Sequence, residues 1–320
     1  MNARHLLAGL VLAWGSAGAW AADGTITIGM VAKSQSNPVF QAAYAGAKDA
    51  ARELGAKLGV KVEIDWQTPP DEDAQKQSEA VEQLARAGVQ GIIVSCSDAN
   101  AVTAAINKAV DLGACVMCFD SDAPRSKRLC YYGTDDVTCG TAVMKELAQI
   151  MGDKGAIAIL AGNQTAPNLQ KRVAGVKEEL AKHPGMKLTA DGVFYHPETP
   201  EQAAEAVNTA QNTHPEIEGW AMIGGWPLFA KNALKWAPGS VKTVSVDALP
   251  AQLAYLKSGH VAALYAQDCY GWGYRSVEIV LNKVVKKQDP PAVRIIDPLT
   301  RVTKETADEY GKKWDKWLGK

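Results

Sequence analysis

Residues 26–55 read ITIGMVAKSQSNPVFQAAYAGAKDAARELG, and this stretch decides the fold. Its first part is apolar and rich in β-branched side chains, which is typical of a buried strand. Asn37 then suits the cap of a helix, with Pro38 at the first helical position. Apolar residues recur at helical spacing from Phe40 until Gly55 ends the helix. The polar turn between strand and helix therefore lies at the carboxyl end of a strand, where open parallel sheets bind ligands.

Strand and helix signals alternate along the rest of the chain, which predicts βαβ units and parallel sheets covered by helices on both faces. About 300 mature residues favour two domains, and two smaller sheets rather than one large sheet. We expect further strands at 60–65, 91–95, 115–119, 129–133, 155–161, 188–194, 218–223, 241–246, 261–266 and 293–296. We expect helices at 71–87, 98–112, 137–151, 168–182, 200–213, 227–236, 248–258, 270–287 and 303–318.

Residues 1–21 are typical of a secretory signal peptide. Arg4 and His5 precede a short apolar segment, and small residues at Ala19 and Ala21 suit a cleavage site after Ala21. The apolar segment is too short to span a bilayer comfortably, although an uncleaved anchor is the alternative. We therefore expect a mature chain that is exported to the periplasm.

Charge and cysteine content restrict the classes of function. The chain has 34 basic and 35 acidic residues and a net charge of −1, so it offers no basic surface for nucleic acid. Cys115 and Cys118 form a C-x-x-C pair inside an apolar strand, without a second pair or a nearby histidine. Buried thiols or one disulfide therefore explain the six cysteines better than a redox or zinc site does. No metal or cofactor is expected.

Polar and aromatic side chains follow many of the expected strands at the point where each strand ends. One such carboxylate is usually a helix cap, but the whole set favours a ligand cleft. Carboxylates and amides accept hydrogen bonds from hydroxyl groups, and lysine donates to hydroxyl or ring oxygens. These residues, which suit a neutral polyhydroxylated ligand, are Lys33, Ser95, Asp120, Ser121, Asn163, Trp226, Asp247 and Gln267.

Phe40 and Trp226 are placed to cover the C–H face of a sugar ring, with core packing as the alternative for both. Enzyme signatures are absent: the sequence contains no G-x-S-x-G, no Walker loop and no H-E-x-x-H. His183, His196 and His214 each precede proline, which is typical of turn residues. These observations predict a binding protein rather than an enzyme.

A group of short motifs supports a family assignment when the motifs are taken together. They are Asn37-Pro38-Val39-Phe40, Gly91-Ile92-Ile93-Val94-Ser95, Phe119-Asp120-Ser121-Asp122, Tyr132-Gly133-Thr134-Asp135, Val246-Asp247 and Ala266-Gln267. With them the mature chain resembles the periplasmic sugar-binding proteins of ABC importers, in the group of ribose, rhamnose and autoinducer-2 receptors. The resemblance implies the α/β architecture of type I periplasmic binding proteins, with two Rossmann-like lobes that close about a hinge.

The resemblance also implies where the lobes begin and end. Three crossovers are expected near Thr134, Gln267 and Pro298. The N-terminal lobe would comprise residues 22–134 and 268–297, and the C-terminal lobe residues 135–267 and 298–320.

The resemblance further implies a set of ligand-binding residues. Asn37, Phe40, Asp120, Asp247 and Gln267 match ligand-contacting positions of the ribose-type proteins. Lys33 is similar to a position in the autoinducer-2 receptor. Two ribose-type arginines are replaced by Ser121 and Gln170, an Asn-Asp pair is replaced by Gly225-Trp226, and Asn168 replaces an acidic residue of the autoinducer-2 receptor. The expected set is Lys33, Asn37, Phe40, Ser95, Asp120, Ser121, Gln170, Trp226, Asp247 and Gln267.

The function implied by the resemblance is capture of a small neutral sugar or polyol and its delivery to the permease of an ABC importer. The alternative is a sensor that presents its ligand to a membrane kinase or chemoreceptor. A monomer without nucleic-acid partners is expected.

Overall fold

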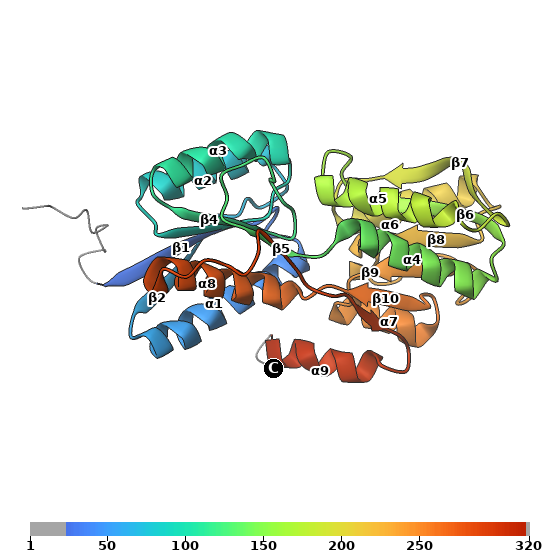
Figure 1. Cartoon of the computed structure of the whole chain (residues 1–320). Coiled ribbons are helices and arrows are strands. Elements are labelled where there is room, and N and C mark those ends of the chain that lie inside the picture. The colour runs from blue at the N-terminus through green and yellow to red at the C-terminus, as the bar shows by residue number, and fades with distance from the viewer. Residues whose placement is uncertain (1–23, 318–320) are drawn as a thin grey trace, which may run out of the picture.

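The computed structural model describes residues 24–317, so the expected signal peptide at 1–21 lies outside the described residues. Within this range the strands form two six-stranded sheets, one in each of two lobes (Figure 1). The first sheet comprises β1 (Thr25–Val31), β2 (Lys61–Trp66), β3 (Gly91–Val94), β4 (Cys115–Phe119), β5 (Tyr131–Gly133) and β11 (Arg294–Ile296). The second comprises β6 (Gly155–Ala161), β7 (Met186–Tyr195), β8 (Gly219–Met222), β9 (Lys242–Val246), β10 (Ala263–Ala266) and β12 (Thr300–Val302).

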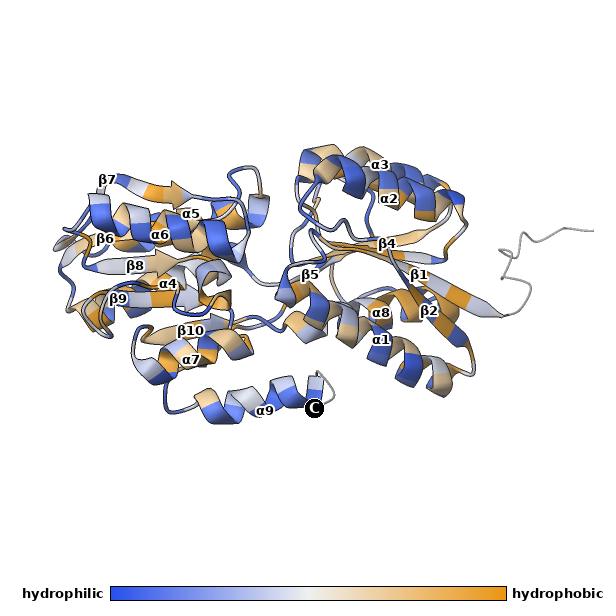
Figure 2. Ribbon diagram, turned by 180° about the vertical axis from the view of Figure 1, so that it is seen from behind, coloured by the Kyte–Doolittle hydropathy of each residue, from blue (hydrophilic) through white to orange (hydrophobic). Residues whose placement is uncertain are grey.

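Helices cover both sheets. The first lobe carries α1 (Pro38–Leu58), α2 (Ala74–Arg86), α3 (Ala99–Asp111) and α8 (Cys269–Lys286). The second carries α4 (Asp136–Met151), α5 (Pro167–Leu180), α6 (Pro200–Thr213), the 3-10 helix η1 (Trp226–Phe229), α7 (Pro250–Ser258) and α9 (Ala307–Trp317). Figure 2 shows hydrophilic and hydrophobic residues alternating along α2 and α3, as expected of helices with one face on a sheet. No helix among residues 24–317 is long and apolar enough to cross a membrane.

The two sheets have corresponding strand orders and differ in the direction of one edge strand. The strand orders are β11-β5-β4-β3-β1-β2 and β12-β10-β9-β8-β6-β7, and among the described strands every pair is parallel except β10 with β12. This arrangement confirms the expected fold class of two α/β lobes with parallel sheets.

The described chain passes between the lobes three times, from β5 to α4, from β10 to α8 and from β11 to β12. All three connections start from the β5–β11 edge of one sheet or the β10–β12 edge of the other, and we call this side the hinge side. We call the space between the two lobes the gap, or the cleft. Its far side is the side of β1, β2, β6 and β7. Helix α9 adds a further contact between the lobes, because Trp317 stacks on Tyr270 of α8 with ring centroids 5.3 Å apart. Trp314 of the same helix is buried and donates its indole N–H to the carbonyl of Ala248 at 2.8 Å.

In each lobe, a glycine allows two neighbouring helices to pack closely against each other. A Cβ added at Gly46 of α1 would lie 2.1 Å from the Tyr270 carbonyl oxygen of α8. In the second lobe, a Cβ added at Gly140 of α4 would lie 1.9 Å from the Arg172 carbonyl oxygen of α5. Any larger residue at these two positions would push the helices apart, so glycine fixes the position of the backbone of Arg172.

The predicted helix at 227–236 is wrong. Only the 3-10 turn η1 forms there, and Asn232 has a positive φ of 55°. The side chain of Asn208 binds the backbone instead, because its amide donates to the Ala233 carbonyl at 2.6 Å and its oxygen accepts from the Lys235 N–H at 3.1 Å. The short antiparallel strand β12 was not predicted, because three residues carry too little periodicity to be recognised.

The six cysteines all lie in the described part of the chain, and all six are free. The sulfur atoms of Cys96 and Cys118 approach to 4.0 Å, and five of the six residues are buried. Among the described residues no group of three or more His, Cys, Asp or Glu could hold a metal ion. The structure therefore agrees with buried thiols and shows no disulfide within residues 24–317.

Candidate functional site

Two aspartates occupy equivalent places in the two lobes. Asp120 follows β4 and Asp247 follows β9, and their φ angles are 55° and 68°. Each donates its backbone N–H to a tyrosine carbonyl on the neighbouring strand, Asp120 to Tyr132 at 3.2 Å and Asp247 to Tyr265 at 2.9 Å. Left-handed backbone is uncommon for residues other than glycine, although aspartate tolerates it better than most. Both lobes thus hold a buried carboxylate at the end of a central strand in a sparsely populated conformation.

A hydrogen-bond network joins the lobes near the hinge side. Gln267 accepts from Thr134 Oγ1 at 2.9 Å and from Arg172 Nη2 at 2.7 Å. Its amide donates to Asp247 Oδ1 at 2.8 Å. Arg172 also donates through Nε to Asp136 Oδ1 at 3.0 Å. Thr134 and Gln267 belong to two of the three connections between the lobes, Asp247 to the loop after β9, and Asp136 and Arg172 to α4 and α5. We call these five residues the hinge end of the cleft.

Asp120 lies in the middle of the gap. Ser95 Oγ donates to Asp120 Oδ2 at 2.6 Å, and Asn168 of the second lobe contributes its amide to Asp120 Oδ1 at 3.5 Å. Gln77 of α2 supports this arrangement from behind, because its amide donates to the carbonyls of Ala32 at 2.7 Å and Ser95 at 2.8 Å. Gln77 thereby fixes the ends of β1 and β3 relative to each other.

Lys33 occupies the far end of the cleft, on the side of β1 and β7. Its ammonium group lies 3.5 Å from Asn168 Oδ1 and 3.7 Å from Glu198 Oε1, both in the second lobe, and 4.0 Å from Glu72 Oε1. Only 2% of Lys33 is exposed. Burial alone would lower its pKa, but the carboxylates of Glu198, Glu72 and Asp120 more than offset this and raise the pKa above its ordinary value. Lys33 is therefore a buried cation in the gap.

Three buried carboxyl groups, those of Glu198, Asp136 and Asp247, have raised pKa values. Burial raises the pKa of Glu198 to about 7, although the nearby Lys33 acts in the opposite direction. Burial also raises the pKa of Asp136 to about 6 against the effect of Arg172, and it raises the pKa of Asp247. Perturbed groups that converge on one gap are typical of a functional site.

Several of the predicted site residues have other contacts. Asn37 caps α1 by accepting the Val39 N–H at 3.1 Å. Phe40 packs against Phe119 and Trp272, with ring centroids 6.5 and 6.2 Å apart. The contact of Asn37 and Phe40 with a ligand stays a prediction. Ligand contact by Ser121 and Gln170 also stays a prediction. Their buried atoms Ser121 Oγ and Gln170 Nε2 have no hydrogen-bond partner among residues 24–317.

Trp226 begins η1 and is 5% exposed. A Cβ added at Gly224 or Gly162 would lie 2.1 or 2.9 Å from its indole ring, so the ring packs against these two glycines. His196 meets Trp226 edge-on at 5.0 Å between ring centroids. The glycines therefore make room for the indole beside the strand that ends at Ala161.

Sequence reasoning missed Arg172, Glu198, Glu72 and Gln77 as members of the site. Glu198 lies three residues after β7, so the strand-end pattern that found the other residues could have found it too. Arg172 sits inside α5, where the sequence gives no sign that its side chain is buried at the cleft.

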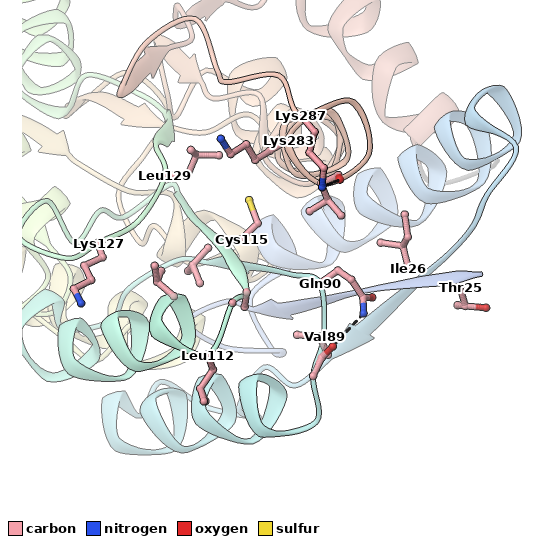
Figure 3. Close-up of a pocket in the computed structure, with 16 residues that line it drawn as sticks. Thr25, Ile26, Val89, Gln90, Leu112, Cys115, Lys127, Leu129, Lys283 and Lys287 are labelled. Atoms are coloured by element: carbon pink, nitrogen blue, oxygen red, sulfur yellow. Dashed lines mark hydrogen bonds between the residues drawn. The ribbon is translucent and has the colours of Figure 1, made fainter. Parts of the chain in front are cut away.

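A separate cavity of about 580 Å³ lies in the first lobe (Figure 3). It opens at the amino ends of the strands, because its lining includes Thr25 at the start of β1, Gln90 before β3 and Cys115 at the start of β4. Ligands of parallel sheets bind at the opposite, carboxyl ends. None of the predicted ligand-binding residues is among the described residues that line this cavity, so we place the candidate site between the lobes.

Comparison with known proteins assigns the family. A family model described as a periplasmic binding protein domain matches residues 28–288. The D-ribose/D-allose-binding protein of Pseudomonas aeruginosa is 28% identical over 253 residues, which cover 74% of this chain and 75% of that protein. The ribose import binding protein of Salmonella typhimurium is 26% identical over 287 residues, which cover 88% and 91%.

Solved structures agree with this assignment. A solute-binding protein from Burkholderia graminis in complex with D-arabinose is 26% identical and superposes with a TM-score of 0.81, covering 89% of this chain and 98% of that chain. A solute-binding protein from Bacillus halodurans with bound myo-inositol is 20% identical with a TM-score of 0.79, covering 91% and 99%, and this likeness shows the fold alone. Because the family model spans well over half of the sequence, this chain belongs to the periplasmic binding protein family, whose members are extracytoplasmic binding proteins and not enzymes.

Proposed function

We propose that this protein captures a small neutral sugar or polyol between its two lobes and delivers it to the permease of an ABC importer. The observation that carries the proposal is the set of buried polar side chains in which Lys33 and Asp120 of one lobe meet Asn168 and Glu198 of the other. Such groups converge on a gap at the carboxyl ends of parallel strands, where a ligand can touch both lobes at once.

The chemistry of the gap suits hydroxyl groups. A sugar hydroxyl donates to a carboxylate such as Asp120 or Asp247 and accepts from Lys33 or Arg172. Asp120, Asp247 and Gln267 are proposed as direct contacts, with Ser95, Ser121 and Gln170 beside them. Trp226 is proposed to cover the C–H face of the sugar ring.

The proposed lobes are residues 22–134 with 268–297, and residues 135–267 with 298–320. Ligand would favour the closed form because only that form lets both lobes contact it. Lys33 and Glu198 lie on the far side of the gap, so their separation should change most when the hinge opens.

An importer role is favoured over a sensor role by the names of the relatives, which include ribose import binding proteins. Export through the signal peptide at residues 1–21 and a monomeric state are part of the same proposal. The membrane permease is the proposed partner.

A thermal-shift screen tests the proposal. The purified mature protein is heated with D-ribose, D-xylose, D-arabinose, L-rhamnose, D-galactose, D-glucose and myo-inositol. A rise in Tm with at least one of them is expected, because a ligand that binds only the folded form stabilises it. No shift with any sugar, deoxysugar or polyol would argue against a sugar receptor.

A further inference from the structure

The far end of the cleft has an unusual balance of charge. Lys33 is its only cation among the described residues, and two carboxylates, Glu72 and Glu198, lie within 4.0 Å of its ammonium group. Asp120 adds a third carboxylate that acts on Lys33. Above the Glu198 pKa of about 7, Lys33, Glu72 and Glu198 together give this end a net charge of −1, from one positive and two negative charges.

Lys33, Glu72 and Glu198 are not fully satisfied by their neighbours among the described residues. Within residues 24–317, the shortest hydrogen bond that Lys33 Nζ donates measures 3.5 Å, to Asn168 Oδ1. Charge-assisted hydrogen bonds of this kind usually measure about 2.7–2.9 Å. Glu72 Oε1 is buried and takes no hydrogen bond from residues 24–317, and Glu198 Oε1 accepts only a long bond of 3.3 Å from the Asn163 N–H. Lys33 donors and carboxylate acceptors therefore both have capacity for a bound molecule.

The position of Glu198 is fixed by its surroundings. Its side chain is 8% exposed, and its Cγ would lie 2.9 Å from a Cβ added at Gly162. The same glycine makes room for Trp226, the proposed cover of the sugar ring. Glu198 thus stands beside the proposed ring site and faces Lys33 across the gap.

The geometry points to Glu198, assisted by Glu72, as the residue that selects the charge of the ligand: the far end accepts a hydroxyl group and rejects a carboxylate or a phosphate. This inference rests on the proposed function. It adds that sugars carrying a carboxylate or a phosphate are excluded as ligands. A hydroxyl accepts from Lys33 and donates to Glu198 or Glu72 in the same place. Above about pH 7, where Glu198 is ionised, a carboxylate or a fully ionised phosphate also accepts from Lys33, but it meets two negative charges and has no proton to give them.

Titration calorimetry on the purified full chain at about pH 8.5, above the Glu198 pKa of about 7, tests this inference with matched pairs of probes. The pairs are D-glucose with D-glucuronate, D-galactose with D-galacturonate, and D-ribose with D-ribose 5-phosphate. The wild type should bind at least one neutral sugar at least about tenfold more tightly than its anionic counterpart. Glu198→Gln should reduce that ratio at least about tenfold, because each removed carboxylate removes one repulsive charge.

Two further variants complete the design. Glu72→Gln changes a more exposed residue, with 16% of its side chain accessible, and should reduce the ratio even if Glu198→Gln folds poorly. Glu201→Gln changes an exposed glutamate three residues from Glu198 and should leave the ratio unchanged.

The outcomes separate this inference from the proposed function. If neutral sugars bind and their anionic counterparts bind equally well, only the charge selection is overturned. An unchanged ratio in both Glu198→Gln and Glu72→Gln overturns it as well, as does a folded Glu198→Gln that loses neutral and anionic probes alike. If neither these probes nor any sugar, deoxysugar or polyol of the thermal-shift screen binds the wild type, the sugar-receptor proposal fails and the charge selection fails with it.

Discussion

Replacing Glu198 by glutamine should change how the stability of the protein depends on pH. Burial raises the pKa of Glu198 from its ordinary 4.5 to about 7, so the folded protein holds this proton more tightly than the unfolded chain does. The stabilisation from this proton is complete below about pH 4.5 and is lost as the pH rises through about 7. Between pH 5 and pH 8 the loss amounts to about 2–3 kcal/mol, because one pKa unit corresponds to about 1.4 kcal/mol.

The other charged groups that face Glu198 remain in the variant, so a direct comparison isolates its effect. They are Lys33, Glu72 and Asp120, and the raised pKa of Lys33 keeps it protonated throughout this pH range. Urea unfolding of wild type and Glu198→Gln at pH 5, 6, 7 and 8 gives the difference in unfolding free energy. The wild type should lose about 2–3 kcal/mol of unfolding free energy relative to the variant from pH 5 to pH 8. For the exposed control Glu201→Gln, the difference in unfolding free energy from wild type should stay constant with pH. A constant difference for Glu198→Gln would refute the reasoning.

Three further predictions concern the cleft and its support. Asp120→Ala should abolish sugar binding in calorimetry, because ligand hydroxyls would lose their acceptor in a buried site; near-native affinity would contradict this role. Trp226→Ala should weaken binding by about 1–3 kcal/mol through loss of ring coverage, and an unchanged Kd in a folded variant would leave Trp226 with a packing role only. Gly140→Val should lower the unfolding free energy by about 1–3 kcal/mol and weaken binding as well, because its Cβ would lie 1.9 Å from the Arg172 carbonyl oxygen and displace α5. Urea unfolding together with calorimetry would detect both effects, and a variant with native stability would contradict the close packing of α4 on α5.

The fold could be predicted largely from local sequence pattern. The cap at Asn37 and the strand 115–119 agree with the structure, because capping chemistry and a short apolar run are properties of neighbouring residues. The segment 227–236 misled the prediction, since Leu228 and Leu234 are buried and apolar, although Leu228 lies only in the 3-10 turn η1 and Leu234 lies in no helix. There the side chain of Asn208, twenty-five residues before Ala233, supplies the backbone hydrogen bonds that a helix would otherwise make.

The candidate site was only partly predictable for a related reason. The rule that ligand-binding residues follow strands found Lys33, Asp120 and Asp247, because the carboxyl ends of parallel strands share one edge of a sheet. It could not find Arg172, whose side chain reaches Gln267 from within a helix ninety-five positions away. Pairings such as that of Lys33 with Glu198 depend on how two lobes face each other, and local patterns carry no such information.

A crystal structure of the protein with the sugar that gives the largest thermal shift tests the central claim most directly. The account predicts the sugar between the two lobes, with its hydroxyl groups within hydrogen-bond distance of the carboxylates of Asp120 and Asp247. A sugar bound in the cavity at the amino ends of β1, β3 and β4, or on the outer surface of either lobe, would contradict it.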